Sequence, residues 1–442
     1  MAATTSTSLT TRRELARGIL ILECVVLVAA ALIFWFPMGG SFIDRGDWLW
    51  LPLVLLPLEA ARLILAGARP VLLPLLGLFA LFLALGALNT VYAPYTSGLA
   101  TLARPFLGMC IVYIMIEVTR ASRRMTYVLA AMVLLALVVG LSAMLLTQWN
   151  EKSAMLGFIT DALPSLRLPP DAQGPLNQMI RGTFGGGYNA NEVAGALSWL
   201  TPLMAGLAIY GWREKQPRTG ATVAFLLLFS ALMLGQSRTA IFGVLPALAL
   251  NIALLIPRGR WRRLAWVALA LVTVFELVLI FNPAERDRLE ARDENSFAAR
   301  LEMWRGGLDI LQDYPLTGVG MNMYRIGPVR ERYPAPLYGD QTRVLPHIHN
   351  EPLQAAVDLG VPGLVVFLGL YVAAGYMLSY TWRHGEALAR AVSVAVGTGL
   401  LAHIVFGMAD AVTLWDRFAT VFWLMIGLAA AQYALTRTRP HA

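Results

Sequence analysis

The stretch that decides the fold reads His347-Ile348-His349-Asn350-Glu351-Pro352 and continues through an apolar segment to Gly360-Val361-Pro362-Gly363. It ends the longest hydrophilic segment of the chain, and a long hydrophobic segment begins directly behind it. Polar, titratable side chains therefore meet the start of an apolar helix at one point. We expect this point to lie at the edge of a membrane and to carry the chemistry of the protein.

The composition is that of an integral membrane protein. The 442 residues are 57% hydrophobic and only 14% charged, with a mean hydropathy of +0.62, whereas soluble domains are about 25% charged. The net charge of +8 lies in short loops on one predicted membrane face, which argues against nucleic-acid binding. Cys24 and Cys110 both lie in apolar runs, so neither a disulfide framework nor a cysteine metal site is indicated.

Apolar runs long enough to cross a bilayer recur along the chain. Roughly 17 to 25 residues span about 30 Å of hydrocarbon as a helix, and we expect about twelve such spans. Their limits are 18–37, 48–66, 70–92, 104–119, 126–147, 189–211, 219–236, 239–256, 263–282, 352–381, 387–408 and 417–435. The first is expected to be a retained helix, because no small-residue cleavage site follows it. The sequence therefore predicts an all-α polytopic membrane protein.

Positive charges predict the orientation. Arg and Lys gather at both termini and in alternate loops, whereas the opposite short loops hold only Arg45, Arg104, Arg238 and Arg417. Because cytoplasmic loops retain positive charge, both termini are predicted to be cytoplasmic. The predicted organisation is a cytoplasmic tail (1–17), nine spans (18–282) with an outer loop at about 148–188, a large outer loop (283–351), three spans (352–435) and a second tail (436–442).

The large outer loop contains a predicted amphipathic helix over residues 296–312. Its apolar residues follow one another at steps of four and three, which is the helical period; they are Phe297, Leu301, Trp304, Leu308 and Leu311. This helix is expected to lie on the membrane surface or across a cavity mouth. Packing of its apolar stripe on the helical bundle is compatible with the pattern and is favoured over a special lipid role.

His349 is the candidate proton acceptor, because an imidazole is the side chain best matched to taking a proton from a hydroxyl at neutral pH. A solvated or structural loop histidine is the alternative. His347 and Glu351 nearby also allow a metal site, but the spacing indicates no third ligand, so no metal is predicted. His403 and Asp410, in and near the eleventh span, are buried polar candidates that more often serve helix packing.

Arginines supply the candidate anion-binding groups. Arg238 stands between two apolar runs with hardly any loop, and a guanidinium there must find a partner such as a phosphate. An interfacial arginine that reaches lipid headgroups is the alternative. For Arg300, beside Glu302 on the predicted surface helix, the alternative is stronger, namely a solvated partner in a helical charge pair, which contributes little. Arg181 precedes a glycine-rich run that leads to Asn191, and this run fits either a phosphate-contacting turn or a flexible loop.

Taken together, these residues resemble those of a known family. The pattern of His349-Asn350, nine residues and then Gly360-x-x-Gly363, after a long outer loop, resembles the O-antigen ligase family of Gram-negative bacteria and its wider superfamily with the O-antigen polymerases. The other matching segments are Ser237-Arg238-Thr239-Ala240, the Gly-Thr-Phe-Gly run at 182–185 that leads to Asn191, Arg300-x-x-x-Trp304, and Pro315-Leu316-Thr317-Gly318-Val319-Gly320.

The resemblance implies a GT-C-like fold and a metal-independent, inverting glycosyltransferase without a cofactor. Its donor is a polysaccharide on undecaprenyl diphosphate, its acceptor is lipid A-core, and its site faces the periplasm from the inner membrane. The catalytic residues it implies are His349, Arg238 and Arg300. Diphosphate contacts are implied for Arg238, Arg300 and Arg181, and supporting roles for Asn350, Asn191, Gly360 and Gly363. In this interpretation His349 takes the acceptor proton, Asn350 orients the imidazole, and the arginines stabilise the departing diphosphate.

Two alternatives stay open. An O-antigen polymerase or a protein O-oligosaccharyltransferase of the same superfamily uses a similar donor with another acceptor. A secondary transporter is the more distant alternative, since the break from Gly360 to Gly363 would suit a discontinuous transport helix. The polar residues gather at the outer boundary and not at mid-membrane, which favours the enzyme.

Overall fold

The computed structural model describes residues 2–35, 53–66, 74–96, 98–147, 188–281, 297–335 and 347–438. Within these ranges the chain is helical and has no strand beyond one isolated bridge between Thr147 and Tyr188. The α-helices are α1 (Ala2–Trp35), α2 (Leu55–Ala66), α3 (Leu76–Tyr92), α4 (Ala103–Ser122), α5 (Thr126–Leu146), α8 (Ala190–Arg213), α9 (Thr219–Gly235), α10 (Arg238–Leu255), α11 (Arg260–Phe281), α13 (Phe297–Asp313), α14 (Gly327–Arg332), α15 (Glu351–His384), α16 (Ala387–Gly407) and α17 (Ala419–Thr438).

Each of the twelve segments predicted to cross the membrane contains one of these helices, although parts of 18–37, 48–66, 70–92 and 263–282 lie outside the described residues. In the described part of the chain, seven of them are long and apolar enough to do so, namely α4, α5, α8, α10, α15, α16 and α17. Helices α3 and α9 are apolar but shorter. The protein is therefore an all-helical polytopic membrane protein, while the total of twelve spans and the orientation stay predictions.

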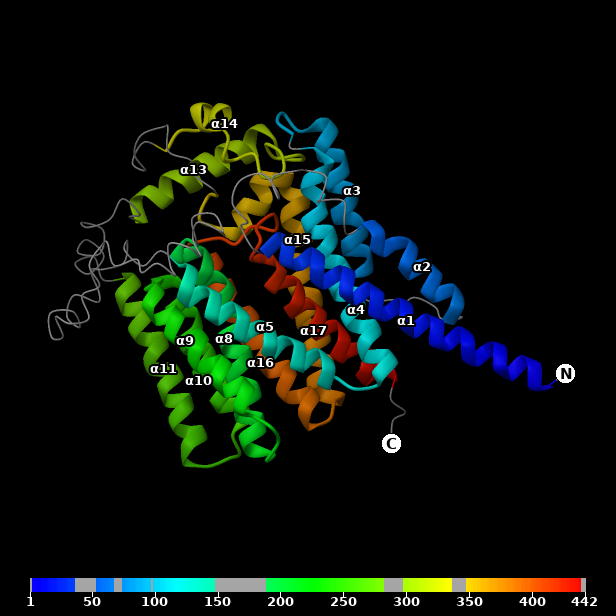
Figure 1. Cartoon of the computed structure of the whole chain (residues 1–442). Coiled ribbons are helices and arrows are strands. Elements are labelled where there is room, and N and C mark those ends of the chain that lie inside the picture. Colours follow the sequence, from blue (N-terminus) through cyan, green and yellow to red (C-terminus); the bar gives the residue numbers. More distant parts are fainter. Residues whose placement is uncertain are drawn as a thin grey trace.

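The helices form one bundle with α13 and α14 lying together across one end (Figure 1). Small residues let the central helices approach closely. A Cβ placed on Gly399 of α16 would lie 2.5 Å from the carbonyl oxygen of Trp199 in α8, and one on Gly108 of α4 would lie 2.2 Å from the ring of Trp423 in α17. Both tryptophans are fully buried at these contacts. These contacts join α8 to α16 and α4 to α17 in the core of the bundle.

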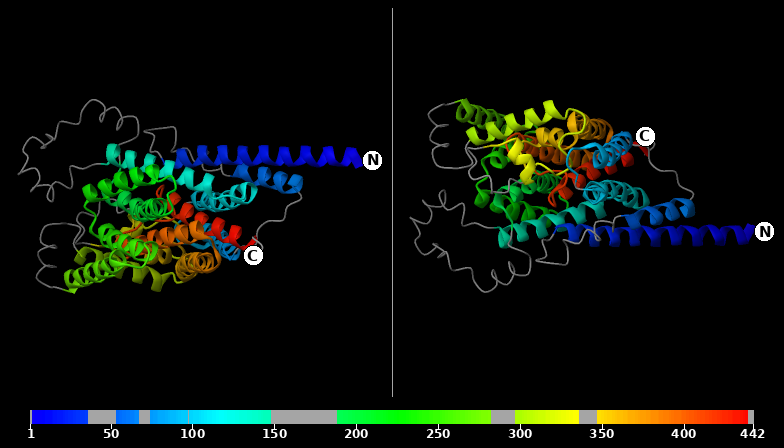
Figure 2. Two further views of the ribbon diagram at one scale, coloured as in Figure 1. Left: turned by 90° about the horizontal axis from the view of Figure 1, so that it is seen from below. Right: turned by 90° about the horizontal axis from the view of Figure 1, so that it is seen from above.

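Helix α1 runs along one side of the bundle in both views of Figure 2. A buried ionic cluster attaches α1 to helices α2 and α4. Arg62 of α2 pairs with Glu23 of α1 at 3.1 Å and with Glu117 of α4 at 2.7 Å, and it also contacts Glu59 of its own helix. Because each charge has a partner of opposite sign, these groups can be buried among apolar helices.

The predicted amphipathic helix is present as α13, one residue later at each end than expected. Its buried face differs from the predicted stripe, because Ala299, Met303 and Ile310 are fully buried while Leu308 is 51% exposed. The reason is the contact that α13 makes with the start of α15, where a Cβ on Gly307 would lie 2.2 Å from Ile348. Packing on the bundle is therefore the arrangement that the structure shows.

Helix α15 bends at Gly360, whose φ of 70° is in the left-handed region that only glycine adopts readily. The turn that follows α13 packs into this bend. Val361 N–H donates to the Pro315 carbonyl at 2.8 Å, and a Cβ on Gly360 would lie 2.5 Å from the carbonyl carbon of Leu316. The element that approaches is a loop, and the Gly363 Cβ position faces Leu359 of its own helix.

Candidate active site

His349 lies in the histidine turn, residues 347–350, which directly precedes α15. Its φ of 53° is left-handed, a conformation that costs about 1–3 kcal/mol and persists only where neighbouring contacts impose it. Its carbonyl accepts a hydrogen bond from Trp304 Nε1 of α13 at 3.3 Å, and its N–H donates to His347 Nδ1 at 3.2 Å. Asn350 then caps α15 by accepting the Leu353 N–H at 2.9 Å. These bonds fix the backbone of the turn that carries the His349 ring.

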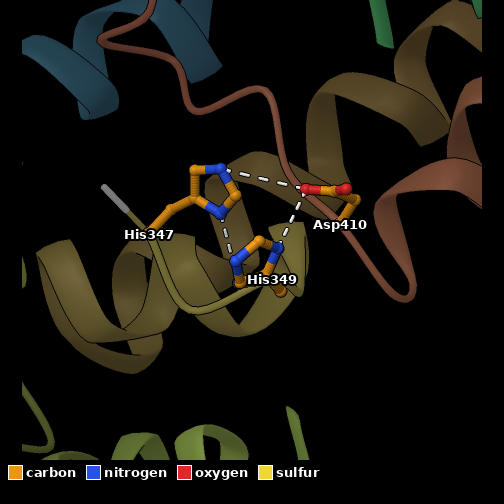
Figure 3. A group of neighbouring side chains, drawn as sticks. All are labelled: His347, His349 and Asp410. Carbon is orange, nitrogen blue, oxygen red and sulfur yellow. Dashed lines mark hydrogen bonds and ion pairs between the residues drawn. The ribbon is translucent and has the colours of Figure 1, made fainter. Parts of the chain in front are cut away.

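The imidazole of His349 is held by the carboxylate of Asp410. The Nδ1 to Oδ1 distance is 3.1 Å, and both side chains are buried. Asp410 belongs to the aspartate loop, residues 408–418, between α16 and α17, and Figure 3 shows the rings of His347 and His349 on the side of its carboxylate. The Ala411 N–H also donates to this Oδ1 at 2.9 Å. Because an ionised carboxylate only accepts hydrogen bonds, His349 Nδ1 carries the proton and Nε2 is the basic atom of the ring.

His347, His349 and Asp410 offer three ligand atoms within 4.8 Å of one another, which a metal ion could use. The third ligand had not been indicated by the sequence. Because His347 Nδ1 accepts the His349 N–H, the proton of the neutral His347 ring lies on Nε2, which faces Asp410 Oδ1 at 3.8 Å. A metal-bound histidine instead donates through its second nitrogen. The hydrogen bonds therefore fit proton transfer better than metal ligation.

The electrostatics of the cluster also fit proton transfer. Burial lowers the pKa of His347 to about 3, and the adjacent His349 adds to this effect. Burial also opposes ionisation of Asp410, but the charge of His349 in its imidazolium form, together with the hydrogen bond of His349, outweighs burial and holds the pKa of that carboxyl well below its usual range. His347 is therefore neutral at neutral pH, and Asp410 is ionised when His349 is in its imidazolium form. The negative charge beside Nδ1 favours the imidazolium that forms when Nε2 takes a proton.

A second set of buried bonds joins the histidine turn to the aspartate loop. Gln354 accepts the Ile348 N–H at 2.8 Å and donates to Asp358 Oδ1 at 3.0 Å. Asp358 also accepts the Trp415 Nε1 proton at 2.6 Å and the Asn322 N–H at 3.1 Å. Three segments that are distant in the sequence are thus fixed to one carboxylate. This rigidity is what a site needs in order to hold a base in a productive geometry.

Arg300 is half-buried on α13 and lies close enough to Asp410 and His347 for its charge to lower the pKa of both groups. The structure therefore brings this predicted residue to the histidine cluster. Arg325, which the sequence analysis did not single out, also acts on His347 by its charge. A cationic rim of this kind would attract an anionic group toward His349.

Arg238 is the exposed first residue of α10. Gly243 of α10 packs on Ala402 of α16, and Asn251 further along α10 accepts a hydrogen bond from Thr398, so the two helices are antiparallel. Arg238 therefore lies at the end of the bundle where α16 leads into the aspartate loop. Among the described residues, no hydrogen bond or ion pair joins Arg238 to the histidine cluster.

Of the two remaining predicted features, the structure describes Asn191 but not Arg181 and its glycine-rich run. Arg181 and the glycine-rich run at 182–187 lie outside the described residues. Asn191 lies in the first turn of α8, and its N–H donates to the capping side chain of Asn189 at 2.8 Å. A Cβ on Gly195, four residues after Asn191, would lie 2.4 Å from Val412, so the start of α8 packs against the aspartate loop.

A segment of the chain matches the model of a known family. Residues 223–368 match the model of a family described as O-antigen ligase. Over this segment, which is less than half of the chain, the protein is similar to the O-antigen ligase family. The matched segment includes Arg238, Arg300 and His349, and it extends past the bend at Gly360. No curated protein matches the chain.

Asp410 lies beyond the segment that matches the O-antigen ligase family. From the sequence, Asp410 is expected to serve helix packing and Asn350 to orient the imidazole. The structure corrects both expectations, since Asn350 donates to the Met408 carbonyl at 3.1 Å while Asp410 contacts the ring. The available signal was an acidic residue at the outer end of an apolar span, which is costly unless it has a partner.

Proposed function

We propose that the protein transfers a preassembled polysaccharide from undecaprenyl diphosphate to lipid A-core at the periplasmic face of the bacterial inner membrane. The observation that carries the proposal is the buried contact between His349 and Asp410, which makes Nε2 of His349 a base at one end of a helical membrane bundle. The O-antigen ligase match supports the class of donor and of reaction.

In the proposed reaction, a hydroxyl of lipid A-core attacks the anomeric carbon from the face opposite the diphosphate. Its proton passes to Nε2 of His349 as the new carbon–oxygen bond forms. The bond between the anomeric carbon and the phosphate oxygen breaks, and its electron pair leaves with undecaprenyl diphosphate. A single displacement of this kind inverts the anomeric centre.

Arg300 and Arg238, together with Arg181, are the proposed diphosphate contacts. The departing oxygens gain negative charge as the bond breaks, and guanidinium groups offset that charge through bidentate hydrogen bonds. Support for Arg300 comes from its charge effect on Asp410, and support for Arg238 comes from its place at the same end of the bundle. Arginines in these positions can carry out this task without a metal ion.

The test is transfer by the purified protein from a lipid-linked glycan, with lipid A-core, a second lipid-linked glycan and a peptide offered separately as acceptors. We expect product when lipid A-core is the acceptor, and no product with either of the other two acceptors. Growth of the lipid-linked glycan would identify a polymerase, and glycosylated peptide would identify a protein O-oligosaccharyltransferase. Uptake of an unmodified solute into liposomes, with no transfer to any acceptor, would identify a transporter.

A further inference from the structure

A second buried imidazole lies near the histidine turn but takes no part in the proposed transfer. His403 Nε2 of α16 lies 3.1 Å from Oε2 of Glu351, the first residue of α15. The side chains are 0% and 5% exposed. The His403 ring also stacks on Trp199 of α8, with centroids 3.4 Å apart and planes 13° from parallel. Three core helices meet at this pair.

The hydrogen bonds around His403 determine how many protons the pair holds. The Gly195 carbonyl, which only accepts, lies 3.1 Å from His403 Nδ1. Ser198 Oγ lies 2.9 Å from the same atom and already donates to Gly195 at 2.7 Å. His403 Nδ1 therefore carries a proton. Since Nε2 and the Glu351 carboxyl are also bonded, they share one further proton, and the pair is neutral as a whole whichever group holds it.

This pair lies where it can fix the positions of both His349 and Asp410. Glu351 follows His349 by two residues, and it opens the helix that Asn350 caps. On the other side, a Cβ on Gly407 of α16 would lie 2.7 Å from Glu351 Oε2. Asp410 comes three residues after that glycine. The start of α15 and the end of α16 are thus joined by one buried bond beside the proposed base.

Stability alone does not account for such a pair. Replacing a buried ionic or polar pair by apolar side chains of similar volume is often neutral or stabilising, because the desolvation cost disappears. A directed hydrogen bond does what apolar packing cannot, in that it fixes the distance and angle between two helix ends. A displacement of about 1 Å in a catalytic geometry can cost about 100-fold in rate.

We propose that Glu351 and His403 are positioning residues, whose bond holds the His349 ring in contact with Asp410. The kinetic part of this inference rests on the proposed transferase function. The geometric part does not, since it concerns the order of residues 347–354 in the protein itself. Neither residue touches a substrate in this proposal.

The decisive variants are Glu351→Ala, which removes the bond, and Glu351→Gln, whose amide can donate to an unprotonated His403 Nε2 and restore it. The matched control is Thr398→Val, which removes another buried hydrogen bond of α16, the 3.2 Å contact with Asn251. That bond lies away from the histidine turn. Each purified variant is compared for kcat, for the KM of the lipid-linked donor, for its melting midpoint, and for hydrogen exchange in residues 347–354.

We expect Glu351→Ala to lower kcat about 10- to 100-fold with an unchanged donor KM, and to speed exchange in residues 347–354 alone. Glu351→Gln restores most of kcat, and Thr398→Val changes neither kcat nor this exchange. Equal loss in the Ala and Gln variants, or exchange that rises throughout α8 and α16, would show a merely structural role. If the wild-type protein transfers no glycan, the proposed function fails, while unchanged exchange in Glu351→Ala would separately overturn the positioning role.

Discussion

Replacing Asp410 by asparagine tests the electrostatic role of the carboxylate with almost no change of shape. The two charged atoms of the imidazolium form lie 3.1 Å apart, at His349 Nδ1 and Asp410 Oδ1. At an effective dielectric constant of about 20 their attraction is about 5 kcal/mol. When the proton is half transferred in the transition state, the attraction is roughly half as large, about 2.5 kcal/mol. Loss of this stabilisation of the transition state lowers kcat about 70-fold.

The assay is single-turnover transfer of a labelled lipid-linked glycan to lipid A-core, with protein in excess. The donor KM and the melting midpoint are measured beside it, and both are expected to stay close to wild type. Asp313→Asn is the matched control, because Asp313 is 42% exposed at the end of α13 and pairs with Arg332 away from the cluster. An Asp410→Asn protein that folds normally and keeps more than half of the wild-type kcat would refute the reasoning.

Four further predictions follow from single contacts. The pKa of His347 is lowered by burial to about 3, below the value of about 6.5 in an unfolded chain, so the stability it contributes is fully present above about pH 6.5 and is lost as pH falls. At pH 4 the loss is about 3 kcal/mol, so the melting midpoint in detergent should fall less steeply between pH 6.5 and 4 in His347→Asn; equal slopes would contradict the assignment. Arg300→Ala should lower kcat about 10- to 100-fold, whereas Arg305→Ala, exposed on the same helix, should not; similar effects of the two would remove Arg300 from the site. Gly360→Ala should lower the melting midpoint, because φ is 70° and a Cβ would lie 2.5 Å from Leu316, while Gly375→Ala, with open space at its Cβ position, serves as control. Chelator should leave transfer unchanged, and activity that chelator abolishes and zinc restores would overturn the proton-acceptor role of His349.

Local pattern was sufficient to predict most of the helices. The run predicted at 189–211 is α8, Ala190–Arg213, and the amphipathic segment predicted at 296–312 is α13, Phe297–Asp313. Both follow from hydrophobic length and period, which are properties of short stretches. The buried face of α13 could not be predicted in the same way, because it depends on which side meets Ile348 and α15.

The candidate site could be predicted only in part, because its contacts also depend on the tertiary fold. His349 could be singled out because its residue type and its place after a polar loop are visible locally. Its partner Asp410 is 61 residues further along the chain, and only the packing of α15 on α16 brings the two together. The bond between Glu351 and His403 likewise spans 52 residues. Contacts of this kind belong to the tertiary fold, so no motif or spacing indicates them.

The central claim, that His349 is the base in glycan transfer, is tested most directly by chemical rescue. Single-turnover transfer from lipid-linked glycan to lipid A-core is measured for His349→Gly with and without added imidazole. We expect a loss of about 100- to 10,000-fold, partly restored in proportion to imidazole concentration, while His347→Gly loses far less and is not rescued. Transfer by His349→Gly at the wild-type rate would show that His349 is not the base.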